Sequence, residues 1–231
     1  MRVTVLELPA AWGDPARVLD CIDRAIGTGL ATDLVLLPEQ SLSGYVSPEG
    51  DFDLAPFAEE LDGPTATRCA RIATAHGIHL VAPLVLREGP ALYNAMVGYS
   101  PTGPVFVYRK RHPWIPETWA TAGPHTLPIA DIAGKKVTIA ICYDVHFLVE
   151  ESRAELVQSD VLLFPSAWVE STDNRARHLT AIATELDIAV VNANWGPGDV
   201  VVHGQARSVI IGRDGRVLGT APRLGRLDIE L

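Results

Sequence analysis

Three polar residues of the sequence, Glu39, Lys110 and Cys142, each stand at the end of a short apolar run. Those runs are residues 34–37, 105–109 and 137–141. Runs of this length and composition predict buried strands. A sheet presents the residues at its strand ends along one rim, so we expect these three side chains to lie close together.

A thiol, a carboxylate and an ammonium group in one place can cleave an amide bond. A cysteine near neutral pH is only a few per cent thiolate, and a carboxylate within hydrogen-bond reach can remove its proton. A fixed ammonium can stabilise the oxyanion that forms when the thiolate attacks a carbonyl carbon, and the backbone N–H of Tyr143 can be a second donor. Cys142 is therefore the candidate nucleophile, Glu39 the candidate general base and Lys110 the candidate electrostatic stabiliser.

Each of these residues alone has a simpler structural explanation. A lone cysteine usually packs as a small hydrophobe, a glutamate at a strand end is usually a cap or an ion-pair partner, and a lysine there is usually a solvated edge residue. The chemical interpretation depends on the three together. Cys142 also stands at a predicted strand-to-helix turn, where N-terminal N–H groups of a helix favour the thiolate.

The composition narrows the classes of partner. With 231 residues, of which 48% are hydrophobic and 20% charged, one domain spanning 1–231 is the simplest organisation. A net charge of −9 without an extended basic run argues against nucleic acid and anionic membrane surfaces. No apolar stretch reaches the roughly 18 residues of a membrane span, and the first residues do not resemble a signal peptide.

The number and spacing of the cysteines and histidines bear on the cellular compartment and on whether the protein holds a metal ion or cofactor. Three cysteines, an odd number placed far apart, argue against a disulfide framework and predict a reducing, cytoplasmic location. Cys21 and Cys69 fall within predicted helices and are expected to be packed residues. No Cys/His cluster has zinc spacing and no glycine-rich phosphate loop is present, so the sequence predicts neither a metal ion nor an organic cofactor.

Predicted strands and helices alternate along most of the chain. The predicted strands are residues 3–8, 34–37, 79–86, 93–100, 105–109, 137–141, 160–168, 188–194, 203–211 and 225–231. The predicted helices are residues 15–26, 64–76, 148–159 and 175–187, with Thr172 or Asp173 as the cap of the last. Two stretches without periodicity, 40–57 and 111–126, are expected to be loops. The alternation predicts an α/β fold, and the late hairpins predict mixed rather than purely parallel sheets.

Several motifs, taken together, resemble those of the nitrilase superfamily, the carbon–nitrogen hydrolases, in its amidase-like branch. The matching segments, in the family's order and spacing, are 37–45 (Leu-Pro-Glu-Gln-Ser-Leu-Ser-Gly-Tyr), 92–94 (Leu-Tyr-Asn), 108–112 (Tyr-Arg-Lys-Arg-His), 141–144 (Ile-Cys-Tyr-Asp), 160–168 (Asp-Val-Leu-Leu-Phe-Pro-Ser-Ala-Trp) and 177–178 (Arg-His). The resemblance implies a four-layer α–β–β–α sandwich and a triad of Glu39, Lys110 and Cys142. It also implies that Glu117 helps to position the substrate and the lysine, and that subunits form a homodimer or higher homo-oligomer.

The sequence departs from the family pattern just after the candidate nucleophile. Similar amidases usually read Cys-Tyr-Asp-x-Arg-Phe-Pro-Glu, whereas residues 142–149 read Cys-Tyr-Asp-Val-His-Phe-Leu-Val. Either these changes retune the pocket, with His146 as a polar contact, or substrate recognition has moved elsewhere, for instance to Glu150. The candidate substrate-binding residues are Tyr45, Tyr143, His146, Trp119 and Trp168.

The favoured function is hydrolysis of the C–N bond of a small amide or N-carbamoyl compound through a cysteine thioester, with water as co-substrate. The Cys-Tyr-Asp motif is the amidase-like version, since true nitrilases of the family tend to have Cys-Trp-Glu-Asn. Nitrile hydrolysis and acyl transfer on the same triad stay open as alternatives. A non-catalytic binding protein on this fold is the third, although the presence of Glu39, Lys110, Cys142 and Glu117 argues against it.

Overall fold

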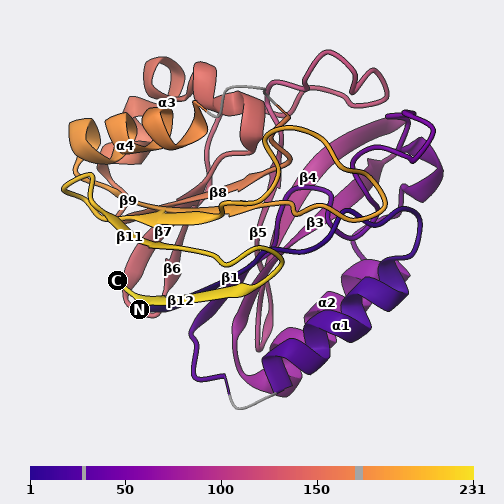
Figure 1. Cartoon of the computed structure of the whole chain (residues 1–231), viewed down its shortest axis with the longest axis horizontal. Coiled ribbons are helices and arrows are strands. Elements are labelled where there is room, and N and C mark those ends of the chain that lie inside the picture. Colours follow the sequence, from indigo (N-terminus) through magenta and orange to yellow (C-terminus); the bar gives the residue numbers. More distant parts are fainter. Residues whose placement is uncertain (28–29, 170–173) are drawn as a thin grey trace.

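The chain folds into two six-stranded sheets that pack face to face, as the computed structural model shows for residues 1–27, 30–169 and 174–231 (Figure 1). The first sheet has the order β12-β1-β2-β3-β4-β5, and the second has the order β11-β10-β9-β8-β7-β6. The strands of the first sheet are β1 (Arg2–Leu6), β2 (Leu34–Leu36), β3 (His79–Glu88), β4 (Ala91–Ser100), β5 (Gly103–Arg109) and β12 (Arg226–Glu230). Those of the second are β6 (Ile129–Ile132), β7 (Lys135–Ile139), β8 (Val161–Ser166), β9 (Ala189–Asn194), β10 (Val209–Ile211) and β11 (Val217–Thr220).

Both sheets are mixed, as the sequence predicts. Strands β1, β2 and β3 are parallel to one another, and so are β7, β8 and β9. The strands that flank each parallel core pair in the antiparallel sense. Parallel neighbours matter for the site because their carboxyl ends meet at the same edge of the sheet.

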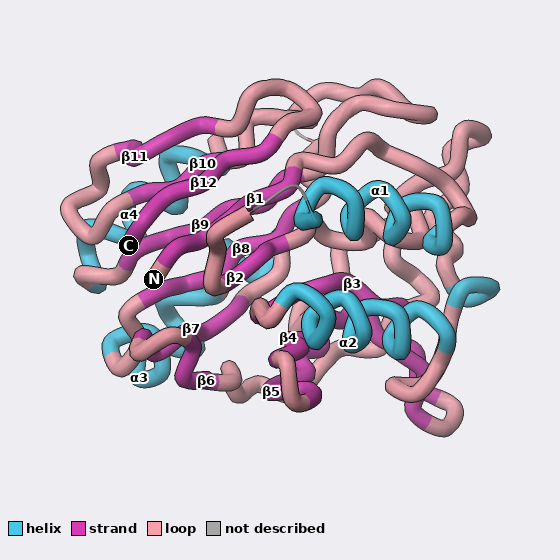
Figure 2. The backbone as a smooth tube through the Cα atoms, turned by 90° about the horizontal axis from the view of Figure 1, so that it is seen from below, coloured by secondary structure: helices cyan, strands magenta, loops and turns pink. Residues whose placement is uncertain are grey.

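Four long helices cover the outer faces of the two sheets. They are α1 (Pro15–Gly27), α2 (Pro64–His76), α3 (Leu148–Val157) and α4 (Arg175–Leu186), and two short 3-10 helices are η1 (Ala55–Phe57) and η2 (Cys142–His146). Helices α1 and α2 lie side by side against the first sheet, and α3 and α4 lie against the second (Figures 1 and 2). The predicted four-layer α–β–β–α sandwich is therefore confirmed.

Strand β2 shows how the layers are held together. Its successive side chains point to opposite faces, as the pleat of a strand requires. Leu34 and Leu36 pack in the hydrophobic cluster shared with the second sheet, whereas Val35 and Leu37 pack in the cluster shared with α1 and α2. A fully apolar run is needed here because both faces of the strand are buried.

The helices begin and end where local chemistry requires. Pro64 stands in the first turn of α2, where its missing N–H leaves no hydrogen bond unmade. Gly77 ends α2 in the left-handed conformation (φ 63°), and its N–H donates to the carbonyls of Ala73 and Thr74. In α1, Val18, Leu19, Ile22 and Ile26 form the buried stripe at helical spacing.

Some expectations from the sequence were wrong. The strand expected over 203–211 begins only at Val209, because Ala206 and Arg207 adopt left-handed backbone angles (φ 69° and 60°). Strand β6 was not expected, since an edge strand of only four residues gives little signal. Cys21 was expected to be packed, but it is exposed on α1. The cap expected at Thr172 or Asp173 lies outside the described residues.

Among the described residues, no helix combines the length and the apolar character that crossing a membrane requires.

A buried carboxylate ties the two sheets together near the carboxyl end of β1. Glu7, with only 2% of its surface exposed, follows β1 in the first sheet. Its Oε2 accepts hydrogen bonds from the N–H (3.0 Å) and hydroxyl (3.1 Å) of Ser208, which precedes β10 in the second sheet. Its Oε1 accepts the N–H of Leu224 at 2.9 Å. One side chain therefore satisfies three donors from two separate segments.

We expect Glu7→Gln to lower the free energy of unfolding by about 2 kcal/mol, because an amide cannot accept hydrogen bonds at both of its polar atoms. Urea unfolding followed by circular dichroism measures the change. Glu230→Gln, an exposed change on β12, is the matched control and should stay within about 0.5 kcal/mol of the parent. Equal stability of the two variants would show that Glu7 does not link the sheets.

Candidate active site

The carboxyl ends of three strands bring the predicted triad together. Glu39 follows β2, Lys110 follows β5 and Cys142 follows β7. The Lys110 ammonium donates to Glu39 Oε1 at 2.8 Å. Glu39 and Lys110 have no exposed surface, and Cys142 is 8% exposed. The first two residues come from one sheet and the third from the other, so the site lies where the sheets meet.

A second carboxylate meets the lysine from the loop after β5. Glu117 Oε1 accepts hydrogen bonds from Lys110 Nζ (2.6 Å) and the Tyr45 hydroxyl (2.8 Å), and Oε2 accepts the N–H of Trp114 (3.2 Å). Burial alone would lower the pKa of Lys110, but the carboxylates of Glu117 and Glu39 outweigh burial and raise it. Burial raises the pKa of Glu117, and Lys110 offsets only part of that effect. The ammonium therefore stays charged between its two partners.

Glu39 is held by donors whose role the sequence did not assign. Asn94 Nδ2 donates to its Oε1 at 2.8 Å, and the backbone N–H of Ala167 donates to its Oε2 at 2.8 Å. Asn94 is itself oriented by Gln40, whose Nε2 donates to Asn94 Oδ1 at 2.8 Å. An asparagine inside the apolar strand β4 was a detectable signal, whereas nothing in the sequence marked the backbone of Ala167.

The backbone at Cys142 is strained. Its φ of 44° lies in the left-handed region, which costs a non-glycine residue about 1–3 kcal/mol. Asp144, two residues on and fully buried, stabilises this turn. Its carboxylate accepts hydrogen bonds from the Ile141 N–H (3.0 Å), the Tyr108 hydroxyl (2.7 Å) and the His112 N–H (2.9 Å). The turn predicted between strand and helix is present, and it begins with η2 rather than directly with α3.

The surroundings of the thiol at this turn disfavour the thiolate form. Burial raises the pKa of Cys142 well above its ordinary value, and the Glu39 carboxylate raises it further. Lys110 and the Ala167 N–H act in the opposite sense but do not compensate. The expectation that helix N–H groups would favour the thiolate omitted burial, which is the larger effect here.

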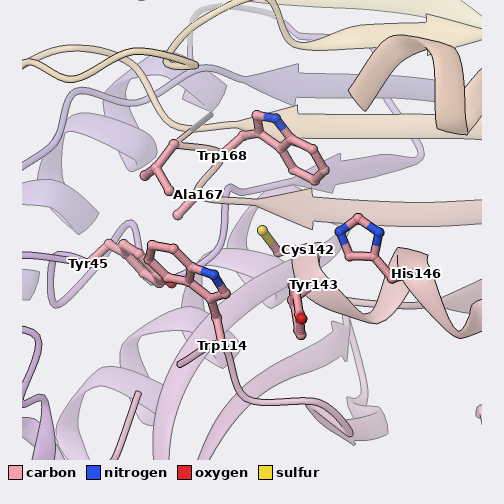
Figure 3. Close-up of a pocket in the computed structure, with 8 residues that line it drawn as sticks. Tyr45, Trp114, Cys142, Tyr143, His146, Ala167 and Trp168 are labelled. Carbon is pink, nitrogen blue, oxygen red and sulfur yellow. The ribbon is translucent and has the colours of Figure 1, made fainter. Parts of the chain in front are cut away.

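A cavity of about 190 Å³ opens onto the thiol (Figure 3). Its lining residues are Tyr45, Trp114, Cys142, Tyr143, His146, Ala167, Trp168 and Val169. Trp168 and His146 stand on one side of the sulfur and Tyr45 and Trp114 on the other. The walls are mainly aromatic and aliphatic.

The structure places four of the five predicted substrate-binding residues on this wall. They are Tyr45, Tyr143, His146 and Trp168. Trp119 does not line the cavity, and Trp114, from the same loop, takes the wall position. Glu150, the alternative recognition residue, is exposed on α3 and does not line it either. A loop without periodicity gave no basis for choosing between the two tryptophans.

Within the described ranges, no group of three or more His, Cys, Asp or Glu residues is arranged to hold a metal ion.

Comparisons with known proteins agree with this geometry. The family model described as carbon-nitrogen hydrolase matches residues 5–227. An (R)-stereoselective amidase from a Pseudomonas species is 32% identical over 230 residues, covering 96% of this chain and 81% of the relative. The omega-amidase YafV of Escherichia coli is 25% identical over 240 residues, covering 100% of this chain and 90% of the relative.

A solved structure with a similar fold comes from the nitrilase superfamily. It is a variant of an amidase from Nesterenkonia AN1, with a TM-score of 0.87 and 27% identity, covering 100% of this chain and 90% of that one. Other structures of the same amidase show the result of Michael addition of acrylamide at the active-site cysteine, and a complex with butyramide. From the family match and these relatives, the chain belongs to the carbon–nitrogen hydrolase family and is an amidase-like enzyme of the nitrilase superfamily.

Proposed function

We propose that the protein hydrolyses the C–N bond of a small amide or N-carbamoyl compound, with Cys142 as the nucleophile. The observation that carries this proposal is the buried Lys110 ammonium, which joins Glu39 and Glu117 next to the cavity that opens onto the thiol: Glu39 accepts from the N–H of the lining residue Ala167, and Glu117 from the hydroxyl of the lining residue Tyr45. Attack on a carbonyl carbon requires a nucleophile, a base and a donor to the oxyanion, and Cys142, Glu39 and Lys110 can supply them. The adduct at the cysteine of the Nesterenkonia amidase, and its bound butyramide, support the same chemistry here.

In the first half of the reaction, Glu39 removes the thiol proton of Cys142 as sulfur attacks the carbonyl carbon. Negative charge develops on the former carbonyl oxygen, where Lys110 Nζ and the N–H of Tyr143 stabilise it. Protonated Glu39 then gives its proton to the leaving nitrogen as the C–N bond breaks. Ammonia or an amine departs, and a thioester on Cys142 remains.

In the second half, Glu39 removes a proton from a water molecule that attacks the thioester carbon. The same donors stabilise the second oxyanion, and the C–S bond breaks with the proton returning to sulfur. The products are the acid and the free enzyme. Glu117 does not exchange protons in this scheme, and it positions Lys110 and, through Tyr45, one wall of the cavity.

The proposal also includes the assembly and location that the sequence predicts. A homodimer or larger homo-oligomer follows from the family resemblance, and the three free cysteines are consistent with a reducing cytoplasm. Light scattering of the purified protein measures the assembly.

Cys142→Ala should abolish ammonia release from a panel of small amides and N-carbamoyl compounds, by at least about 10⁴-fold in kcat, because the covalent route is lost. Cys21→Ser, a change at the exposed cysteine of α1, is the control and should retain full activity. Undiminished release by Cys142→Ala would rule out the thioester route. Release from nitriles alone would favour the nitrilase alternative.

Glu39→Gln should lower kcat by about 10²–10⁴-fold, since this is the usual contribution of a general base. Steady-state ammonia release gives kcat, and circular dichroism verifies that the variant is folded. Glu88→Gln, at a half-buried glutamate of β3 paired with Arg109, should change kcat less than threefold. If both glutamine variants had parental kcat values, Glu39 would not be the base.

Iodoacetamide should modify Cys142 at a rate that keeps rising above pH 9, because burial and Glu39 hold the thiol pKa above its ordinary value of about 8.5. Mass spectrometry of the Cys21→Ser protein measures this rate free of labelling at the exposed thiol. Cys69 should stay unmodified, since burial raises its pKa to about 12. A plateau below pH 8 would mean that the resting enzyme already holds a thiolate.

A further inference from the structure

The wall of the cavity carries no fixed positive charge. The described lining residues include no lysine or arginine, and His146 is the one histidine among them.

The Lys110 ammonium behind the cavity wall is already committed to two carboxylates and, in the proposed reaction, to the oxyanion at the reacting carbon, so it is not available to a second anion. Lys110 has no exposed surface, and its ammonium already donates to Glu39 and Glu117. Two carboxylates therefore surround one ammonium. A third carboxylate that entered the cavity would lose its hydration and meet a site whose charge is negative or neutral.

The wall suits an apolar group of limited size. Trp114, Trp168 and Tyr45 present aromatic rings, and Ala167 and Val169 present small aliphatic groups. An engineered cavity of about 150 Å³ in another protein holds benzene. The cavity of about 190 Å³ thus has room for an amide group with a short aliphatic chain or a small ring.

We propose that the substrates are short, uncharged monoamides with an apolar acyl group, and not amides or N-carbamoyl compounds that carry a free carboxylate. This inference rests on the proposed amide hydrolysis, whose substrate class it narrows. It separates the protein from omega-amidase-like chemistry, because an ω-amide of a dicarboxylic acid bears a carboxylate at its far end. The carboxylate of such a substrate would lie against indole and phenol rings.

His146 sets this preference at the mouth of the cavity. It is exposed, and its ring lies 6.4 Å from the ring of Trp168 and 5.0 Å from that of Tyr143 (centroid to centroid). Its position is that of the arginine in the motif of similar amidases. A guanidinium there would be a permanent cation at the cavity wall, which an imidazole is not.

Three substrates of equal chain length test the proposal: butyramide, succinamide and succinamate. The first ends in a methyl group, the second in a neutral amide and the third in a carboxylate. We expect kcat/KM at pH 8 to fall in that order, with butyramide at least about 30-fold above succinamate, because the carboxylate has no partner. Equal or higher kcat/KM for succinamate would overturn the proposal.

His146→Arg should raise kcat/KM for succinamate by about tenfold and leave that for butyramide within about threefold. His146→Gln is the matched control and should not raise kcat/KM for succinamate, because glutamine adds no charge. A gain for succinamate in both variants would mean that the imidazole obstructs the substrate, and the assignment to charge would be wrong.

Failure of the hydrolytic proposal is distinguishable from failure of this one. If none of the three compounds releases ammonia, their binding to Cys142→Ala is measured by quenching of the fluorescence of Trp114 and Trp168 on the cavity wall. Tighter binding of butyramide than of succinamate would support the substrate class without hydrolysis. Equal binding, or no binding of butyramide below about 100 mM, would overturn it.

Discussion

The structure depends on one lysine ammonium that is buried between two carboxylates. Lys110 donates to Glu39 at 2.8 Å and to Glu117 at 2.6 Å. Removing one partner of such a pair leaves an uncompensated buried charge and costs about 3–5 kcal/mol. Two carboxylates also exceed what one ammonium can neutralise, so their remaining lone pairs need other donors. Asn94 and the Ala167 N–H meet that need for Glu39, and the hydroxyl of Tyr45 meets it for Glu117.

These donors come from both sheets, so the charge cluster fixes how the sheets are placed relative to each other. Glu39 and Lys110 follow strands of the first sheet, whereas Ala167 follows β8 of the second. The hydrogen bond from the Ala167 N–H to Glu39 therefore crosses the interface between the sheets. Asp144 crosses it too, because it accepts from Tyr108 at the end of β5 while holding the turn at Cys142. A small shift between the sheets would break the site before it broke the hydrophobic core, since apolar contacts are not directional.

The sequence pointed to Glu39, Lys110 and Cys142 as a candidate triad because each follows a local apolar run, and such runs can be recognised without knowing the fold. The four layers were implied by family resemblance, since periodicity alone predicts only an α/β class. The choice of Trp119 over Trp114 was wrong as a wall residue because the loop 111–126 has no periodicity from which a direction could be read. The strand expected from 203 failed for a tertiary reason. Asn194 and Arg175 donate to the carbonyl of Ala206 and so hold the left-handed backbone there.

The raised pKa of Cys142 clarifies how the proposed reaction handles charge. A resting thiolate would add a third negative group beside Glu39 and Glu117, with Lys110 as the one ammonium among them. Proton transfer that is coupled to attack avoids this state. As Glu39 becomes neutral, the new negative charge appears on the substrate oxygen. Lys110 can stabilise the negative charge in either position. The total charge around the ammonium is then the same before and after attack, so little reorganisation of the buried groups is needed. The same balance explains why a substrate carboxylate is unfavourable, because it would add a negative charge that no step of the reaction removes.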